Sequence, residues 1–246
     1  NGGNELQLDA SVVDRRDFKF DLDASASTNT NRLLQLGAGI PPITFNNGEQ
    51  MHVQGYPLGG YWQRAILSYK DLNGDGILSR ANCAGQPVVV GGPACEVVLS
   101  ATPQYRGSAL PTKTLTVSPS FTVFRNLRLS ALFDYRGGFY VYNETQEFRC
   151  TSSAFNSCPE VNNPHAALAD QAAAIAKLEG SSWGYIQPGD FTKLREVSAT
   201  ITLPTAWAHR VNAAGLSLTF AGRNLHTWTK YKGFDPELNS LSPSGF

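Results

Sequence analysis

The sequence predicts an all-β protein built from long antiparallel strands. Three observations predict this class: six segments alternate between apolar and polar residues, charged residues make up only 16% of the chain, and glycine is frequent, with 23 of 246 residues. An average soluble domain has roughly 25% charged residues. Because side chains alternate between the two faces of a strand, each alternating segment has one apolar and one polar face.

The alternating segments are joined by connections whose lengths follow a regular order. The segments span residues 6–12, 18–25, 114–121, 127–136, 196–203 and 216–221. Connections 14–17 and 124–126 are tight and 204–215 is intermediate, whereas 30–110 and 143–189 are long excursions and another begins at 225. Short turns at one end and long loops at the other are typical of outer-membrane barrels. In a soluble β-sandwich, short and long connections are rarely separated to opposite ends in this way. We therefore expect an antiparallel transmembrane β-barrel segment of about six long strands.

One short helix is expected inside the second long excursion. Residues 164–178 are rich in alanine, which has the highest helix propensity, and a proline at position 164 suits a first helical turn. Since the segment lies within a loop, we interpret the helix as a surface feature.

Aromatic residues gather at the strand ends that carry the long connections. This placement predicts an aromatic girdle at a membrane interface, with Trp207 at the opposite interface. Ordinary aromatic packing is the alternative interpretation. The residues are Phe139, Tyr140, Tyr142, Trp183, Tyr185, Phe191, Trp228 and Tyr231.

Charge balance and the length of the apolar runs exclude two classes of protein. Lys plus Arg and Asp plus Glu are 20 each, so the basic excess that marks a nucleic-acid-binding surface is missing, and we expect no nucleic-acid partner. The longest apolar runs fall short of the ~20 residues of a membrane-spanning helix, which excludes a helical membrane protein.

The chain opens on the loop-like residues 1–3, without an initiator methionine or a leader. We therefore interpret it as a piece of a longer protein or a mature product.

Four cysteines form two local pairs in loop-like sequence. Cys83 and Cys95 are 12 residues apart, and Cys150 and Cys158 are 8 apart. Neither spacing suits structural zinc. Two short-range disulfides in an oxidising compartment fit best. Four free thiols in a cytosolic protein remain the alternative.

A candidate calcium loop lies in the first long excursion. Asp71, Asn73 and Asp75 occupy loop positions 1, 3 and 5, a glycine follows at position 6, and Ile77 offers its carbonyl at position 7. Position 12, where a bidentate glutamate is expected, is Asn82. The sequence therefore predicts a Ca²⁺ site at these residues. A tight Asn-Gly and Asp-Gly turn without metal is the alternative.

The sequence shows no constellation for catalysis. The four histidines are scattered, and no nucleophile elbow, zinc-protease or phosphate-loop motif occurs. We expect no catalytic residue and no enzymatic activity.

The last third of the chain carries a family resemblance. Residues 190–197, 201–204 and 222–237 closely resemble the final section of SusC/RagA-type TonB-dependent outer-membrane transporters, although His226 stands where the family usually has an aromatic residue. Upstream, residues 55–59, 71–76 and 107–111 are similar to the same family and occur in its order. The resemblance covers about residues 50–240.

This resemblance implies a fold, a location and partners. The family forms a barrel of about 22 strands with an N-terminal plug, and the chain would be its C-terminal part, without plug, TonB box, earlier strands and last strand. It implies a bacterial outer-membrane location with the long loops extracellular, a SusD-like surface lipoprotein and TonB as partners, lipid around the wall, and import of glycans or peptides. A soluble β-rich surface or glycan-binding module is the main alternative. A secreted calcium-stabilised enzyme is the least supported.

Overall fold

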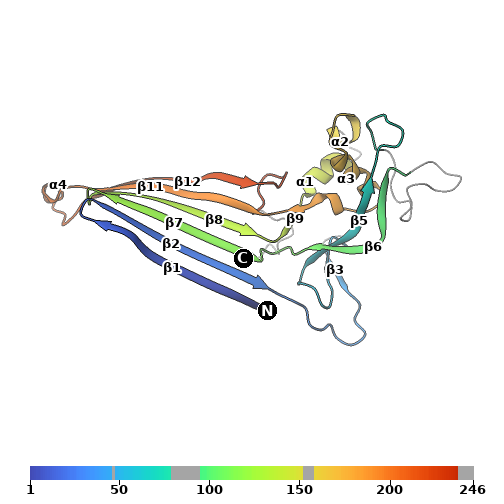
Figure 1. The fold of residues 1–246 in the computed structure, drawn as a ribbon, viewed down its shortest axis with the longest axis horizontal. Coiled ribbons are helices and arrows are strands. Elements are labelled where there is room, and N and C mark those ends of the chain that lie inside the picture. The colour runs from blue at the N-terminus through green and yellow to red at the C-terminus, as the bar shows by residue number, and fades with distance from the viewer. Residues whose placement is uncertain (46–47, 79–94, 152–157, 238–246) are drawn as a thin grey trace. The chain divides into compact units, whose positions relative to one another are not determined.

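The structure, a computed structural model, describes residues 1–45, 48–78, 95–151 and 158–237. They fold into two compact units that alternate along the chain (Figure 1). The sheet unit comprises Asn1–Thr30, Pro111–Gly138 and Asp190–Lys230. The loop unit comprises Asn31–Leu110, Phe139–Gly189 and the residues from Tyr231 onward.

The sheet unit is one antiparallel sheet of six long strands. All six predicted strands are confirmed, and each pairs with its neighbour along the sheet in the order β1-β2-β7-β8-β11-β12. The strands are β1 (Gly2–Arg15), β2 (Phe18–Thr30), β7 (Lys113–Val123), β8 (Leu127–Gly137), β11 (Phe191–Thr202) and β12 (Ser217–Thr229). The all-β class is therefore confirmed for this unit.

The short connections all lie at one end of this sheet (Figure 1). The turn between β7 and β8 needs two left-handed residues, Phe124 at φ 50° and Arg125 at φ 63°. The connection between β11 and β12 contains the short helix α4 (Thr205–Arg210). Both long excursions leave from the opposite end, as the alternating connection lengths predict.

The register of the sheet gathers its apolar side chains on one face. Val117 lies between Ala24 and Phe133 on the neighbouring strands, and Phe121 stacks on Phe20 with ring centroids 4.6 Å apart. Residues paired directly across strands share a face, so the apolar positions of six strands form one continuous surface. Leu6 and Phe220 on this face are 68% and 67% exposed. The strands thus present a wide apolar face that the sheet unit does not bury.

The loop unit contains strands that the sequence did not predict. A four-stranded antiparallel sheet in the order β3-β4-β5-β6 occupies the first long excursion, and β9 pairs with β10 in the second. Their bounds are β3 (Ile43–Phe45), β4 (Gln50–His52), β5 (Gly60–Tyr69), β6 (Val97–Gly107), β9 (Tyr140–Tyr142) and β10 (Ile186–Pro188). The helices are α1 (Glu144–Thr151), α2 (Pro159–Asn162), α3 (Leu168–Leu178) and the 3-10 turn η2 (Trp183–Tyr185).

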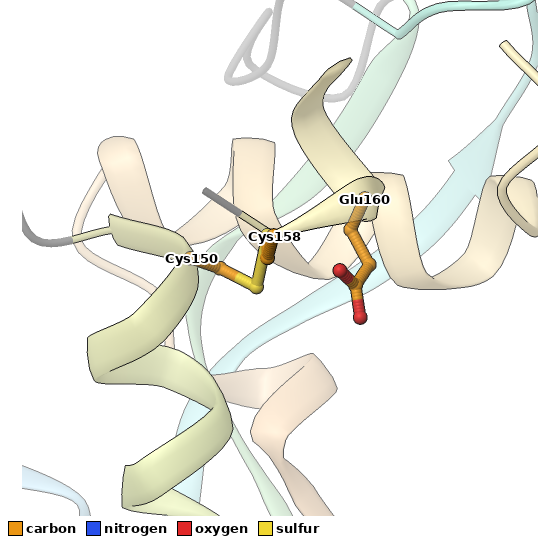
Figure 2. Close-up of side chains that lie close together, drawn as sticks. All are labelled: Cys150, Cys158 and Glu160. Carbon is orange, nitrogen blue, oxygen red and sulfur yellow. A yellow bond between two sulfur atoms is a disulfide. The ribbon is translucent and has the colours of Figure 1, made fainter. Parts of the chain in front are cut away.

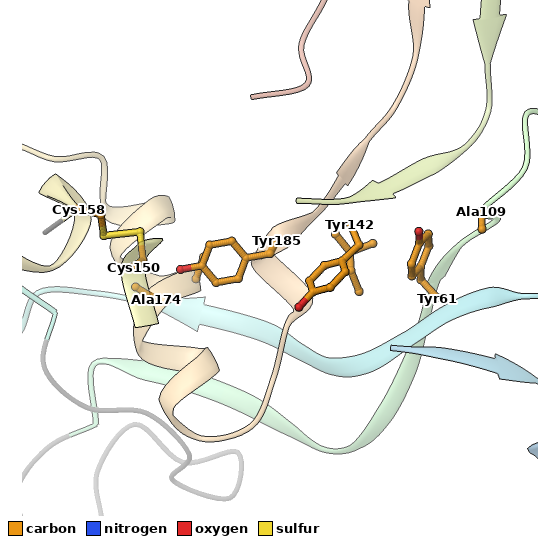
Figure 3. Close-up of a cluster of buried hydrophobic side chains, with 9 residues drawn as sticks. Tyr61, Ala109, Tyr142, Cys150, Cys158, Ala174 and Tyr185 are labelled. Carbon is orange, nitrogen blue, oxygen red and sulfur yellow. A yellow bond between two sulfur atoms is a disulfide. The ribbon is translucent and has the colours of Figure 1, made fainter. Parts of the chain in front are cut away.

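The predicted helix exists as α3, but it begins at Leu168 and is not a surface feature. Ala167 has an extended conformation, so the helix cannot continue back to residue 164. Four of its alanines, at 172, 173, 174 and 176, are buried. A Cβ atom at Gly184 would lie only 2.2 Å from the Cβ of Ala173, which shows how closely η2 approaches the helix. The helix is therefore a central part of the loop unit's core (Figure 3).

Within the described residues, no helix is both long and apolar enough to cross a membrane.

Candidate functional site

The loop unit contains a pocket of about 390 Å³. Residues of α1, α2, α3, the junction between β9 and α1, and the segment after β12 line it. The lining residues are Asn143, Thr145, Gln146, Arg149, Glu160, Asp170, Lys232, Gly233 and Phe234.

Side-chain amides tie the pocket's elements together. Asn143 accepts a hydrogen bond from the Gln146 backbone through Oδ1 (3.1 Å) and donates through Nδ2 to Gln146 Oε1 (3.1 Å). Gln187 donates to the same Gln146 oxygen (2.9 Å) and accepts from the backbone N–H of Lys232 (3.2 Å). Gln146 also donates to Glu160 Oε1 (3.3 Å). Because each amide uses both its donor and its acceptor, the network fixes the residue that follows β9, α1, β10 and residue 232 in one arrangement.

Two ion pairs stand in the pocket wall. Arg149 contacts Glu160 with 3.3 Å between the guanidinium nitrogen and Oε1, and Lys232 contacts Asp170 at 2.6 Å. The acids are the deeper members: the side chains of Glu160 and Asp170 are 12% and 25% exposed, whereas those of Arg149 and Lys232 are each 53% exposed. The pocket therefore presents cations outward, each held by an acid behind it.

The Cys150–Cys158 disulfide fixes one of these pairs (Figure 2). It joins Cys150, near the end of α1 and next to Arg149, to Cys158, the residue before α2 and two positions before Glu160, with 5.0 Å between the two Cα atoms. The two sulfurs and a Glu160 oxygen lie within 4.8 Å of one another. Metals bind cysteine as thiolate, so sulfurs joined in a disulfide do not form a metal site here.

A buried acidic cluster lies among α1, α3 and the residue before β4. Lys177 binds Glu147 at 2.8 Å and lies 3.8 Å from Glu49, while its ammonium also donates to Ser182 (2.8 Å). One lysine thus serves two buried carboxylates. Burial raises the pKa of Glu49 above its usual value, because the ionised carboxylate loses hydration that Lys177 only partly replaces.

The predicted calcium residues lie together in one compact loop. Asp71 accepts hydrogen bonds from the backbone N–H groups of Gly74 and Gly76, both at 2.7 Å, and these bonds hold its pKa below the usual value. Asp75 accepts from Ile77 (2.8 Å), and the Asn73 amide donates to Asp75 (2.8 Å). Asn82 lies outside the described residues. The loop closes through its own hydrogen bonds, so the Ca²⁺ site stays a prediction.

The two predicted disulfides differ in outcome. Cys150 and Cys158 are joined. Cys95 is buried, but Cys83 lies outside the described residues, so the pairing of these two stays a prediction.

Several aromatic residues expected at an interface pack inside instead. Phe139, Tyr142 and Tyr185 are buried in the loop unit, and Tyr142 and Tyr185 belong to its main core cluster with Tyr61 (Figure 3). For these the alternative interpretation, ordinary packing, is right. Trp207 and Trp228 are 56% and 49% exposed.

Sequence reasoning missed the pocket because its residues come from four separate segments without a shared spacing. The one available signal was the family resemblance of residues 222–237, which includes Lys232 and Phe234.

Comparison with known proteins tests the family resemblance that the sequence shows. No family model matches the chain. Over 97% of its length the chain is 22% identical to "TonB-dependent receptor P3" of Formosa agariphila. It also matches solved structures of the RagAB peptide importer, in an open-open and a closed-closed state, each with a TM-score of 0.66 over 96% of the chain, at 18% and 19% identity. The resemblance to TonB-dependent transporters of the SusC/RagA type is confirmed.

The match to these transporters is partial in length. The chain spans about a quarter of the proteins it matches, 25% of the receptor and 26% of the RagAB chain. Those relatives are a receptor and transporters, not enzymes, which supports the expectation that the chain has no catalytic role. The likeness to the solved structures confirms the fold class of the six-stranded sheet.

Proposed function

We propose that this chain forms part of the wall and the outer loops of a TonB-dependent importer in a bacterial outer membrane. The observation that carries the proposal is the continuous apolar face of a six-stranded sheet whose short turns share one end. Contact with lipid removes such an apolar face from water and is therefore favourable, while the polar face opposite it would line an aqueous lumen. The long excursions would then face the cell exterior.

The proposal includes partners and a class of cargo. TonB would supply energy through an N-terminal region, and a SusD-like surface lipoprotein would cover the loop side, as the sequence resemblance implies. The cargo would be an oligomeric nutrient, a glycan or a peptide. The name of the RagAB peptide importer, a relative in fold, supports a peptide.

The first experiment measures the intact mass and the detergent dependence of the natively isolated protein. We expect a polypeptide about four times as long as this chain, because the chain covers 25% of its curated relative, and extraction only with detergent. A mass of 26.6 kDa in a monodisperse, detergent-free solution would overturn the proposal of an importer. It would favour a soluble surface protein or a glycan-binding module.

We also propose Ca²⁺ as a ligand of the loop formed by Asp71, Asn73, Asp75 and the Ile77 carbonyl. Two carboxylates and an amide at alternate positions are hard oxygen donors of the kind that Ca²⁺ prefers. Gly76 supports the tight turn, since its φ is +81° and a Cβ there would lie 2.9 Å from the Pro164 carbonyl oxygen.

A further inference from the structure

The pocket's two cations have donor capacity left for a ligand. In the part of the chain that the structure describes, Arg149 makes one hydrogen bond, to Glu160, although a guanidinium carries five N–H donors. Among the same described residues, the Lys232 ammonium makes two hydrogen bonds, both to Asp170, and an ammonium carries three donors. Each cation is half-exposed and each acid lies deeper. A ligand entering the pocket therefore meets positive groups first.

We propose that this pocket binds a carboxylate group of the imported oligomer between Arg149 and Lys232. Carboxylates form short, charge-assisted hydrogen bonds with guanidinium groups, often through two parallel N–H donors. Glu160 and Asp170 position the two cations and are not themselves ligands. The inference rests on the proposed import function and deepens it, because it names the chemical group that the outer loops recognise.

The pocket also offers an apolar contact beside the charges. Phe234 lines it and is 94% exposed, the highest value among the large hydrophobic residues that the structure describes. An aromatic ring in this position fits the carbon atoms next to a carboxylate, either the side chain of a C-terminal amino acid or the ring face of an acidic sugar. The amide network and the disulfide hold Arg149 and Lys232 in place before binding, which lowers the ordering cost.

Two features argue against a cation as the ligand. Both carboxylates already pair with basic groups, and both are less exposed than their partners. A cationic ligand would have to displace Arg149 or Lys232 before it reached an acid. A carboxylate needs no such exchange.

Calorimetry on the intact natural protein in detergent tests this site with three probes: trialanine, its C-terminal amide, and trigalacturonate. We expect trialanine to bind and its amide to bind at least about tenfold more weakly, since charge-assisted hydrogen bonds are lost. Arg149→Gln and Lys232→Gln should each weaken binding by a similar factor, while Lys232→Arg should retain it. Arg125→Gln, in the β7–β8 turn of the sheet unit, is the matched control and should not change affinity.

The outcomes distinguish a peptide carboxylate from that of an acidic sugar. They also distinguish a failure of the carboxylate site from a failure of the proposed import function. Binding of trigalacturonate but not trialanine, with loss in the Arg149 and Lys232 variants, supports the site and assigns it to acidic sugars. Equal binding of trialanine and its amide, or unchanged affinity in both glutamine variants, would overturn it. So would a failure of all three probes to bind a detergent-dependent protein of full length, which leaves the import function standing. A small soluble protein would instead overturn the import function.

Discussion

Asp134 on β8 and Arg195 on β11 form an ion pair on the polar face of the six-stranded sheet, with 2.7 Å between Oδ2 and the guanidinium nitrogen. Against β8, Arg195 is the extra residue of a β-bulge between Leu194 and Glu196; against β12, the extra residue lies on β12, between Arg223 and His226. A bulge re-aims a side chain, and here it brings a cation to the carboxylate. Asp134 also accepts from Arg136 at 3.1 Å, so one acid serves two arginines.

Removing this acid should destabilise the sheet more than removing another acid of the same face. Asp134→Ala leaves Arg195 and Arg136 as close like charges, and we expect a loss of about 1–3 kcal/mol. The readout is the temperature at which the detergent-solubilised protein loses its folded band on a gel. Asp9→Ala on β1, whose bond to Gln7 is exposed, is the control and should cost less than about 0.5 kcal/mol. Equal shifts in both variants would refute a special role for Asp134.

The orientation of the sheet can be tested with arginine substitutions on its two faces. Val117 lies on the apolar face near the middle of β7, and Val117→Arg should cost roughly 2–4 kcal/mol in membrane assembly. Ile201→Arg, close to the end of β11, should cost less because the penalty falls toward the interface. Ser118→Arg, on the polar face beside Val117, is the matched control and should assemble normally. Normal assembly of Val117→Arg would contradict the orientation.

The buried carboxylate of Glu49 predicts a pH dependence of stability. The pKa of Glu49 in the folded protein is raised above the ordinary glutamate value of 4.5. Between that value and the folded-state pKa, the folded protein therefore binds the proton more strongly than the unfolded chain does. The contribution of Glu49 to stability is therefore present at low pH and lost as the pH rises through the folded-state pKa.

Glu49→Gln should remove the loss of folding stability that accompanies ionisation of Glu49 as the pH rises. It keeps a side-chain oxygen that can accept the hydrogen bond from the Ser182 hydroxyl. We expect the variant to melt above the unsubstituted protein near neutral pH, with a difference that vanishes as the pH falls toward 4.5. Glu144→Gln, at an exposed position of α1, should show no such trend. A melting difference that does not vary with pH would rule out burial of Glu49 as its cause.

Chelation tests the proposed Ca²⁺ loop. If the ion binds, removing it with a chelator should lower the melting temperature of the intact protein, because a ligand of the folded state stabilises it. Asp75→Ala should abolish that response, and Asp9→Ala, on β1, should keep it. An unchanged melting temperature after chelation would favour the plain turn closed by Asp71 and Asp75.

The strands of the sheet unit could be predicted because their environment imposes a period of two. Each has one apolar face, as at Leu115, Val117 and Phe121, so the sequence itself records the fold. The strands of the loop unit leave no such record. β6 begins with Val97, Val98 and Leu99, all buried, so both of its faces lie against other groups and the alternation disappears.

The candidate site was harder to predict than the fold. Alanine runs predict a helix, which α3 confirms, but helix propensity alone does not say whether the helix is buried. Arg149 and Glu160 are 11 residues apart, and Asp170 and Lys232 are 62 apart, distances that no local pattern links. Only the tertiary fold, with its disulfide and amide network, brings them into one pocket.

The regular order of the sheet has a consequence for how such a chain can change over generations. The two long excursions that return to the sheet, between β2 and β7 and between β8 and β11, each leave and re-enter at neighbouring strands, at the same end of the sheet. The entropy of closing a flexible loop grows only with the logarithm of its length, so doubling an excursion adds about 0.6 kcal/mol to the closure cost. The two excursions can therefore lengthen, shorten or diverge while the paired strands that carry them keep their register.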